Sequence, residues 1–209
     1  MAIARAFKIL TLSENVEQFD AGPAGIGIFC LPLMGVVLGV ILVGMNLALE
    51  PYLASEVLAV LLLTIWIVAT AGRHLSGLQQ TVATWGRTNT AVDSSDRGAV
   101  QGVLAVLIVV LFKSHCLEVI GESRGSSVLL TPLLARWSLL LFLFGSTPLG
   151  DDVSARIVGQ IRSWHLIAAT VASLGLALFF ASNHALWVAL SLSLLALRAR
   201  SYLHRRNGG

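Results

Sequence analysis

Two long stretches without charged residues constrain the fold most strongly. No Asp, Glu, Lys or Arg lies between Asp20 and Glu50, or from Ser163 to Leu197. A helix needs about 20 mainly apolar residues to cross the roughly 30 Å core of a bilayer, because unpaired backbone groups cannot face lipid. Charged residues make up only 12% of the 209 positions and hydrophobic residues 56%. The sequence therefore predicts an all-α integral membrane protein.

The chain is predicted to form one helical membrane domain, residues 1–209, with about six crossings. The predicted spans cover residues 25–49, 53–72, 99–120, 126–149, 163–181 and 185–197. The last two divide the second uncharged stretch at Ser182, Asn183 and His184. Because both are short, a re-entrant hairpin remains an alternative. Residues 1–20 are predicted to lie along the headgroups as an interfacial segment, without a cleaved signal.

The distribution of basic residues predicts the orientation. Six crossings place both termini on one face of the membrane, and that face then holds eleven of the fourteen Lys and Arg residues. Basic residues in short loops are retained on the cytoplasmic side, so both termini are predicted to be cytoplasmic. Because these residues are spread over membrane-flanking loops, without a cluster of basic and aromatic side chains, no nucleic-acid partner is expected.

A segment without carboxylates follows the second predicted span. No Asp or Glu occurs between Glu56 and Asp93, and the middle of this interval reads Arg-His-Leu-Ser-Gly-Leu-Gln-Gln-Thr over residues 73–81. It resembles the His-Leu-Asp-Gly-Leu-x-Asp-Thr-x-Asp signature of the cobalamin synthases, the membrane adenosylcobinamide-GDP ribazoletransferases. Ser76, Gln80 and Ala83 stand where that signature has its three acids.

Further segments carry the same resemblance in the order of the family. They are similar to its Phe-Pro-Leu-Val-Gly entry, its Asp-Ser-Arg-x-Gly-x-x-Gly-Val-Leu segment, its buried lysine and its Pro-x-x-x-Arg helix. In this chain they lie at residues 29–35, 95–104, 111–113 and 132–137. Residues 203–209 resemble the point where the family continues into another crossing. The resemblance therefore implies a C-terminally shortened member, located in the bacterial inner membrane.

The resemblance implies a specific chemistry and its loss. The family joins adenosylcobinamide-GDP to a ribazole nucleotide and releases GMP, assisted by a divalent metal ion. Acids at positions i, i+4 and i+7 of a helix share one face and can converge on one ion, and Mg²⁺ prefers such oxygen ligands. Ser76, Gln80 and Ala83 keep the spacing without the charges, so we expect no metal site, no catalytic residue and no cofactor. Magnesium is expected only if the chain is an active transferase.

Several polar residues remain as candidate ligand-binding groups. Four are candidate ligand-binding residues: His74, Arg97, Lys113 and Arg136. A cation within a span should face protein or water instead of lipid, and it could bind an anionic headgroup or a nucleotide. The alternatives are snorkelling of Lys113 to the interface, internal hydrogen bonding of Arg136 and a helix-end role for His74. Asp96 beside Arg97 could hold one phosphate-associated ion, or form a solvated ion pair.

Three functions remain open from the sequence. The first is a non-catalytic accessory or scaffold subunit of a larger membrane complex, bound to other integral membrane subunits. The two glycines of Gly35-x-x-x-Gly39 could pack against such subunits or against another helix of the same chain. The second is a divergent but active ribazoletransferase. The third is a haem- or pigment-binding subunit that uses His165 and His184. Loss of the acids favours the first.

Overall fold

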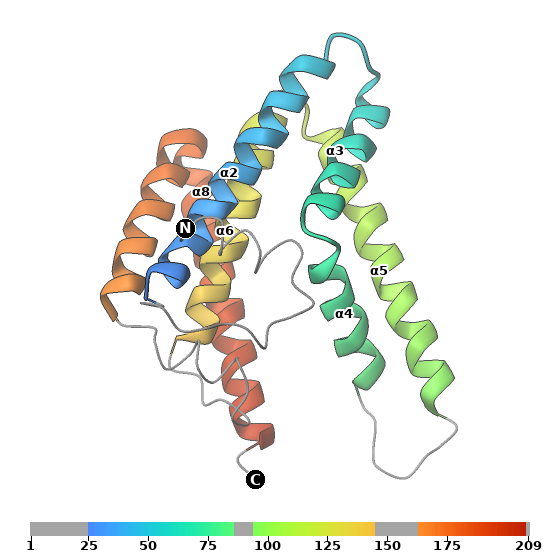
Figure 1. Cartoon of the computed structure of the whole chain (residues 1–209), viewed down its shortest axis with the longest axis vertical. Helices are drawn as coiled ribbons and strands as arrows, with labels where there is room; N and C mark the ends of the chain where they lie inside the picture. Colours follow the sequence, from blue (N-terminus) through green and yellow to red (C-terminus); the bar gives the residue numbers. More distant parts are fainter. Residues whose placement is uncertain (1–24, 86–93, 145–162, 208–209) are drawn as a thin grey trace. The chain divides into compact units, whose positions relative to one another are not determined.

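The computed structural model describes residues 25–85, 94–144 and 163–207. The interfacial segment predicted over residues 1–20, Asp93 and the side chains of Asp96 and His184 lie outside what it describes. All regular secondary structure in the described residues is helical (Figure 1). Its helices are α2 (Gly25–Leu49), α3 (Ser55–Ala69), α4 (Arg73–Thr84), α5 (Ser94–Val119), the 3₁₀ turn η2 (Gly121–Ser123), α6 (Arg124–Leu143) and α8 (Ser163–Asn207).

Four of the described helical segments are long and apolar enough to cross a membrane. They are Pro32–Leu49, Arg97–Val119, Gly121–Leu143 and Ser163–Phe180. α3 and α4 add a fifth if they count as one broken span, although their axes differ by 83°. The all-helical class is thus confirmed for the described residues. The six crossings and the cytoplasmic termini stay predictions.

The chain divides into two compact units. One combines residues 1–43 with residues 125–209, and the other consists of Gly44–Arg124. We call them the α6–α8 unit and the α3–α5 unit, and describe each separately.

In the α3–α5 unit, α3 and α4 both run antiparallel to α5 (Figure 1). Near one end the Ser55 hydroxyl donates a hydrogen bond of 3.2 Å to the Glu118 carbonyl oxygen. Near the other end Ala83 lies against Gly98. Because α3 has only 15 residues, or about 22 Å of helix, it is shorter than a bilayer core. The predicted span over residues 53–72 therefore covers α3 and the break that follows it.

The break between α3 and α4 is a tight helix C-terminus. The amide of Gly72 donates to the Ile67 carbonyl at 2.8 Å and that of Ala71 to the Val68 carbonyl at 3.0 Å, the two hydrogen bonds of a Schellman motif. Ala71 has φ 49° and Gly72 φ 63°, so both occupy the left-handed region. Glycine adopts this conformation freely, but a residue with a Cβ atom pays about 1–2 kcal/mol. Ala71 is therefore a strained position.

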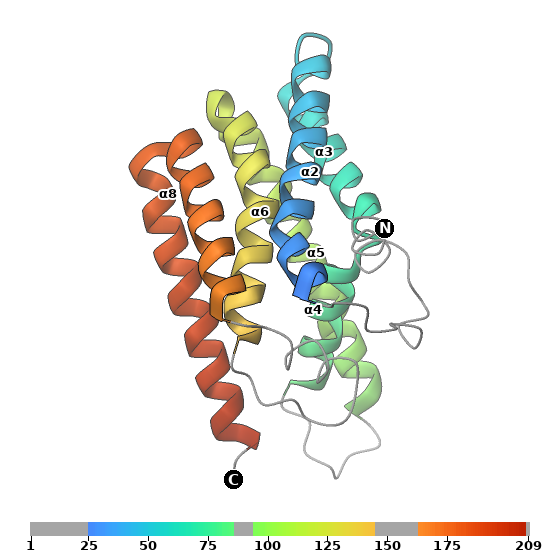
Figure 2. The ribbon, with the colours of Figure 1, turned by 60° about the vertical axis from the view of Figure 1, so that its left-hand side comes forward.

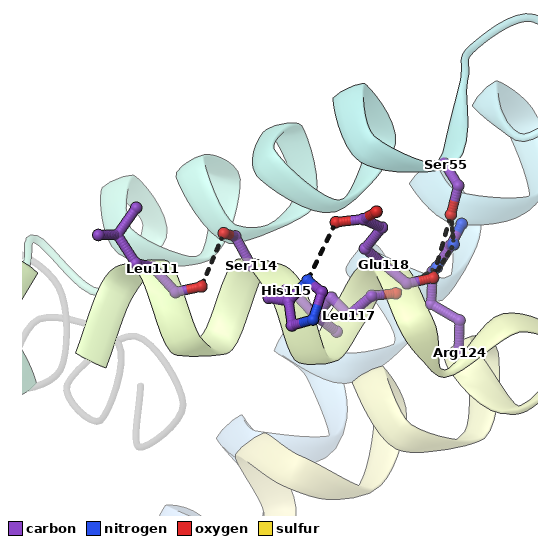
Figure 3. A network of polar contacts seen from close by, with 7 residues as sticks. All are labelled: Ser55, Leu111, Ser114, His115, Leu117, Glu118 and Arg124. Atoms are coloured by element: carbon purple, nitrogen blue, oxygen red, sulfur yellow. Dashed lines mark hydrogen bonds and ion pairs between the residues drawn. The ribbon is translucent and has the colours of Figure 1, made fainter. Parts of the chain in front are cut away.

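Arg124 lies where α5 ends and α3 begins, at the end of this unit opposite the Ala83–Gly98 contact (Figure 3). Its buried guanidinium donates from Nε to the Leu117 carbonyl at 2.8 Å, and from Nη2 to the Glu118 carbonyl at 3.3 Å and to Ser55 Oγ. The last carbonyls of a helix have no intrahelical donor. Arg124 therefore satisfies the C-terminus of α5 and ties it to the first residue of α3.

In the α6–α8 unit, glycines bring α2 against α6. A Cβ atom at Gly35 would lie 2.7 Å from the Pro132 carbonyl oxygen, and one at Gly39 would lie 2.6 Å from that of Leu129. The Gly35-x-x-x-Gly39 spacing thus packs internally. A Cβ atom at Gly44 would meet nothing within 4 Å, so that glycine makes no comparable contact.

α8 reverses direction within its own length (Figure 2). Trp137 Nε1 donates to Thr170 Oγ1 at 3.0 Å, and Arg200 Nη1 donates to the Phe144 carbonyl at 2.6 Å. Trp137 and Phe144 are about 10 Å apart along a helix, whereas Thr170 and Arg200 would be about 45 Å apart in a straight one. Both parts of α8 therefore lie beside α6. The reversal lies between Thr170 and Arg200, and this interval contains the break that the sequence predicts at residues 182–184.

Packing between α6 and α8 forms the core of this unit. Leu130, Leu133, Leu134 and Trp137 of α6 are buried in one cluster with Ala177 and Ala189 of α8. The small α8 side chains allow the helices to approach closely while the large α6 side chains fill the space between them.

Candidate functional site

The segment with the replaced acids forms α4, and α4 packs against the first turns of α5. A Cβ atom at Gly98 would lie 2.5 Å from the carbonyl oxygen of Ala83, and one at Gly102 would lie 2.6 Å from that of Gln79. No residue with a Cβ atom fits these positions without displacing the α4 backbone. The two glycines therefore fix how α4 lies against α5 (Figure 1).

The three acid-replacing positions lie on one side of α4. Ser76, Gln80 and Ala83 fall within an arc of about 60° on a helix of 3.6 residues per turn. Ser76 and Gln80 are exposed, and Ala83 is half-buried beside Gly98. The spacing predicted from the sequence is thus realised on a helix. The polar side chains at these three positions are the neutral hydroxyl of Ser76 and the neutral amide of Gln80.

The hydroxyl groups of α4 are engaged by their own helix. Ser76 Oγ donates to the Arg73 carbonyl at 2.9 Å, Thr81 Oγ1 to the Gly77 carbonyl at 2.7 Å, and Thr84 Oγ1 to the Gln80 carbonyl at 2.9 Å. Such bonds satisfy the hydroxyl protons locally. The hydroxyl groups of α4 are therefore satisfied within the helix, and α4 carries no negatively charged side chain.

The two charged side chains that the structure describes next to α4 are basic. Arg73 begins α4, Arg97 lies directly before Gly98, and both side chains are exposed. α4 itself contains no Asp or Glu. α4 therefore supplies no carboxylate ligand for a divalent cation.

His74 lies at the break between α3 and α4. Its Nδ1 is 3.2 Å from Thr70 Oγ1, and the same hydroxyl is bonded to the Trp66 carbonyl at 2.9 Å. The imidazole is exposed. This geometry is that of a hydrogen-bonded residue at a helix end.

The remaining two candidates do not join this surface. Lys113 lies 16 residues after Arg97, about 24 Å further along α5, too far to share a small ligand with it. Its half-buried ammonium stands 5.2 Å from the ring centre of Trp66 in α3, within cation–π range. Arg136 belongs to the other compact unit. It is half-buried, and its Nη1 donates to the Pro132 carbonyl at 2.9 Å.

The described residues do not provide a magnesium site at α4. Mg²⁺ needs carboxylate, phosphate or water oxygens in near-octahedral geometry. Ser76 uses its proton within the helix, Gln80 offers one neutral oxygen, and Ala83 offers none. Across the described chain, no three His, Cys, Asp or Glu side chains lie where they could share an ion.

Comparison with known families decides the relationship. The family model described as cobalamin-5-phosphate synthase matches residues 2–209. The chain belongs to this family. The overall resemblance of the sequence to the family therefore reflects common descent.

Individual relatives agree with this assignment. The chain is 33% identical over 214 residues to the adenosylcobinamide-GDP ribazoletransferase of Pseudomonas paraeruginosa, an alignment that covers 95% of the chain and 82% of the relative. The protein of that name from Pseudomonas aeruginosa is 31% identical over the same shares. One from Roseiflexus is 31% identical over 76% of the chain and 61% of the relative. No solved structure gives a significant match.

Sequence reasoning overlooked Arg124 at the α3–α5 end. Arg124 is not among the candidates named from the sequence, yet its guanidinium is buried. The available signal was a basic residue four positions after the predicted span over residues 99–120, because Arg near a helix C-terminus can bond the last carbonyls.

Proposed function

We propose that this chain is a non-catalytic member of the cobalamin synthase family, which works as an accessory membrane subunit. The observation that carries the proposal is the α4 surface. Ser76, Gln80 and Ala83 keep the spacing of the family's acids on a helix that contains no Asp or Glu. Transfer to a diphosphate-activated substrate depends on metal ions to neutralise developing charge. Without carboxylates, this surface lacks the groups that would hold the ion.

A turnover assay tests the loss of catalysis. The purified chain is mixed with adenosylcobinamide-GDP and the ribazole nucleotide, with and without Mg²⁺, and GMP release is measured. The Pseudomonas paraeruginosa relative serves as the positive control. We expect no GMP above the protein-free background from this chain in either condition. Magnesium-dependent GMP release by the wild-type chain would overturn the proposal.

An active transferase is the second candidate function. It is supported by the family match over residues 2–209 and by the close packing of Gly98 and Gly102 against α4, which keeps the motif helix in place. In that case acids from outside α4 would have to hold the ion. The same assay distinguishes the two functions, because only an active enzyme releases GMP.

The accessory role requires partners within the membrane. The family relationship and the apolar helices favour the bacterial inner membrane as the location, and other integral membrane proteins as the partners. Gly35 and Gly39 are already packed on α6, so they are not free to form such a contact. Purification of the tagged chain in a mild detergent tests this role: a stoichiometric membrane protein is expected to co-purify, and a chain that elutes alone would argue against it.

The haem-binding alternative has little support in the structure. His165 is buried, and its ring stacks against Trp164 with 3.9 Å between ring centres. Haem iron is bound by an imidazole nitrogen in the plane of the ring, so a buried His165 would need a cavity beside that nitrogen. We expect the purified protein to be colourless, and a Soret band in its absorbance spectrum would revive this alternative.

A further inference from the structure

The break between α3 and α4 lies beside the middle of a membrane span. α5 contains the span Arg97–Val119, which has 23 residues or about 35 Å of helix. On the α4 side of the break, Gln79 packs on Gly102, five residues inside this span. On the α3 side, Trp66 lies beside Lys113, six residues before the end of the span, with 5.2 Å between the ammonium and the ring centre. The break is therefore about 8 Å or more from either end of the span.

α4 runs from this break back toward the end of the span that begins at Arg97. The contacts of Gln79 and Ala83 with the two α5 glycines follow each other in the antiparallel direction. Ser76 lies three residues nearer the break than Gln79, which places it about 12 Å inside the span. α3 and α4 together are long and apolar enough for one broken span, which agrees with this depth.

One side of α4 is polar at this depth. Arg73, His74, Ser76 and Gln80 are exposed, and so is Ala71 in the break. Hydrocarbon offers no hydrogen-bond partner to a guanidinium or an amide, so contact with lipid is unfavourable for both groups. Polar side chains and irregular backbone therefore occur at membrane depth only where protein covers them or water reaches them.

We propose that water reaches the polar side of α4 as far as the middle of the bilayer, from the membrane face at which α5 begins. Such a path admits a water-soluble ligand to Arg73 and His74 without passage through lipid. Cover by a partner helix is the alternative. Helices that meet inside a membrane pack through small or apolar residues, whereas this side presents a guanidinium, an imidazole and an amide. The proposal does not depend on whether the chain is a transferase.

Cysteine labelling in the membrane tests the proposal. Ser76→Cys and Leu104→Cys are each made in the full chain with Cys30→Ala and Cys116→Ala. Leu104 is 51% exposed, lies about 11 Å inside the span and faces away from the α5 glycines that pack on α4. It is the matched control, because it has nearly the depth of Ser76 on an apolar surface. Unsealed membrane fragments expose both faces to a charged methanethiosulfonate reagent.

The expected result is a large difference in labelling rate. A cysteine reacts as its thiolate, which forms in water and is disfavoured in apolar surroundings. We expect Ser76→Cys to be labelled more than about tenfold faster than Leu104→Cys. Equally slow labelling of both would place this side of α4 against lipid or protein, and would overturn the proposal. Equally fast labelling would show that water is not excluded at this depth of α5, and would overturn it too.

A second position covers the case in which Ser76→Cys disturbs α4. Gln80→Cys lies one turn nearer the membrane face and should be labelled at least as fast as Ser76→Cys. Complete labelling of every variant after denaturation in sodium dodecyl sulfate shows that its thiol is free to react. Labelling of Ser76→Cys and Gln80→Cys only after extraction into detergent would mean that protein or lipid covers them in the membrane, and would contradict the proposal.

Discussion

The contact between α4 and α5 gives the sharpest structural prediction. A methyl group at Gly102 would lie 2.6 Å from the Gln79 carbonyl oxygen and 2.9 Å from its Cγ. Relief requires a shift of the α4 backbone by several tenths of an ångström. Gly77 lies on α4 itself, and a Cβ atom there would meet nothing within 4 Å. Both substitutions, Gly102→Ala and Gly77→Ala, therefore add a methyl group to a helix. The methyl group clashes with α4 in Gly102→Ala and meets nothing in Gly77→Ala.

The expected magnitude follows from the difference between the two variants. Replacing glycine by alanine within a helix stabilises the folded state by about 0.5–1 kcal/mol, and both variants share this gain. Overpacking costs about 1–3 kcal/mol and affects Gly102→Ala alone. Gly102→Ala should thus be less stable than Gly77→Ala by about 1–3 kcal/mol, or several degrees in Tm for a chain of this size.

Two assays check this difference. Thermal unfolding in detergent gives the Tm of each variant, and hydrogen exchange reports the amides of α4 separately. We expect faster exchange in α4 for Gly102→Ala and unchanged or slower exchange for Gly77→Ala. Equal stabilisation by both variants would refute the close contact between α4 and α5.

Three further substitutions probe other parts of the structure. Ala71→Gly relieves the left-handed strain at the α3–α4 break and should raise stability by about 0.5–1 kcal/mol, measured by Tm; a lower Tm would contradict the Schellman geometry. Arg124→Met leaves the Leu117 and Glu118 carbonyls without their side-chain donor and should lower stability by about 1–3 kcal/mol. Hydrogen exchange of the amides at the end of α5 should become faster, and unchanged exchange would argue against the cap. Trp137→Phe removes the donor to Thr170 and should lower stability by about 1 kcal/mol, and the change should be smaller when Thr170 is already valine.

The sequence predicted the helical class and the start of α2 well, because uncharged stretches leave few alternatives in a membrane. It did not predict the break after Ala69. Ala71 has a positive φ, and alanine gives no local signal for that conformation, so residues 53–72 read as one apolar span. The left-handed turn there depends on the two hydrogen bonds that close the end of α3.

The candidate site was also only partly predictable from the sequence. Helical spacing alone placed Ser76, Gln80 and Ala83 on one side of α4. The glycines of α5 were visible in the sequence, but their contacts with Ala83 and Gln79 depend on how the two helices pack. The cap made by Arg124 likewise depends on Ser55, far away in the sequence, being brought next to the end of α5.

Mn²⁺ binding tests most directly whether the α4 surface holds a divalent ion. Electron paramagnetic resonance counts free and bound Mn²⁺ in the purified chain and in the combined variant Ser76→Asp, Gln80→Asp and Ala83→Asp. We expect no stoichiometric Mn²⁺ on the wild-type chain and one bound ion per chain in the variant. One tightly bound Mn²⁺ on the wild-type chain, lost when Gln80 is changed to alanine, would contradict the account.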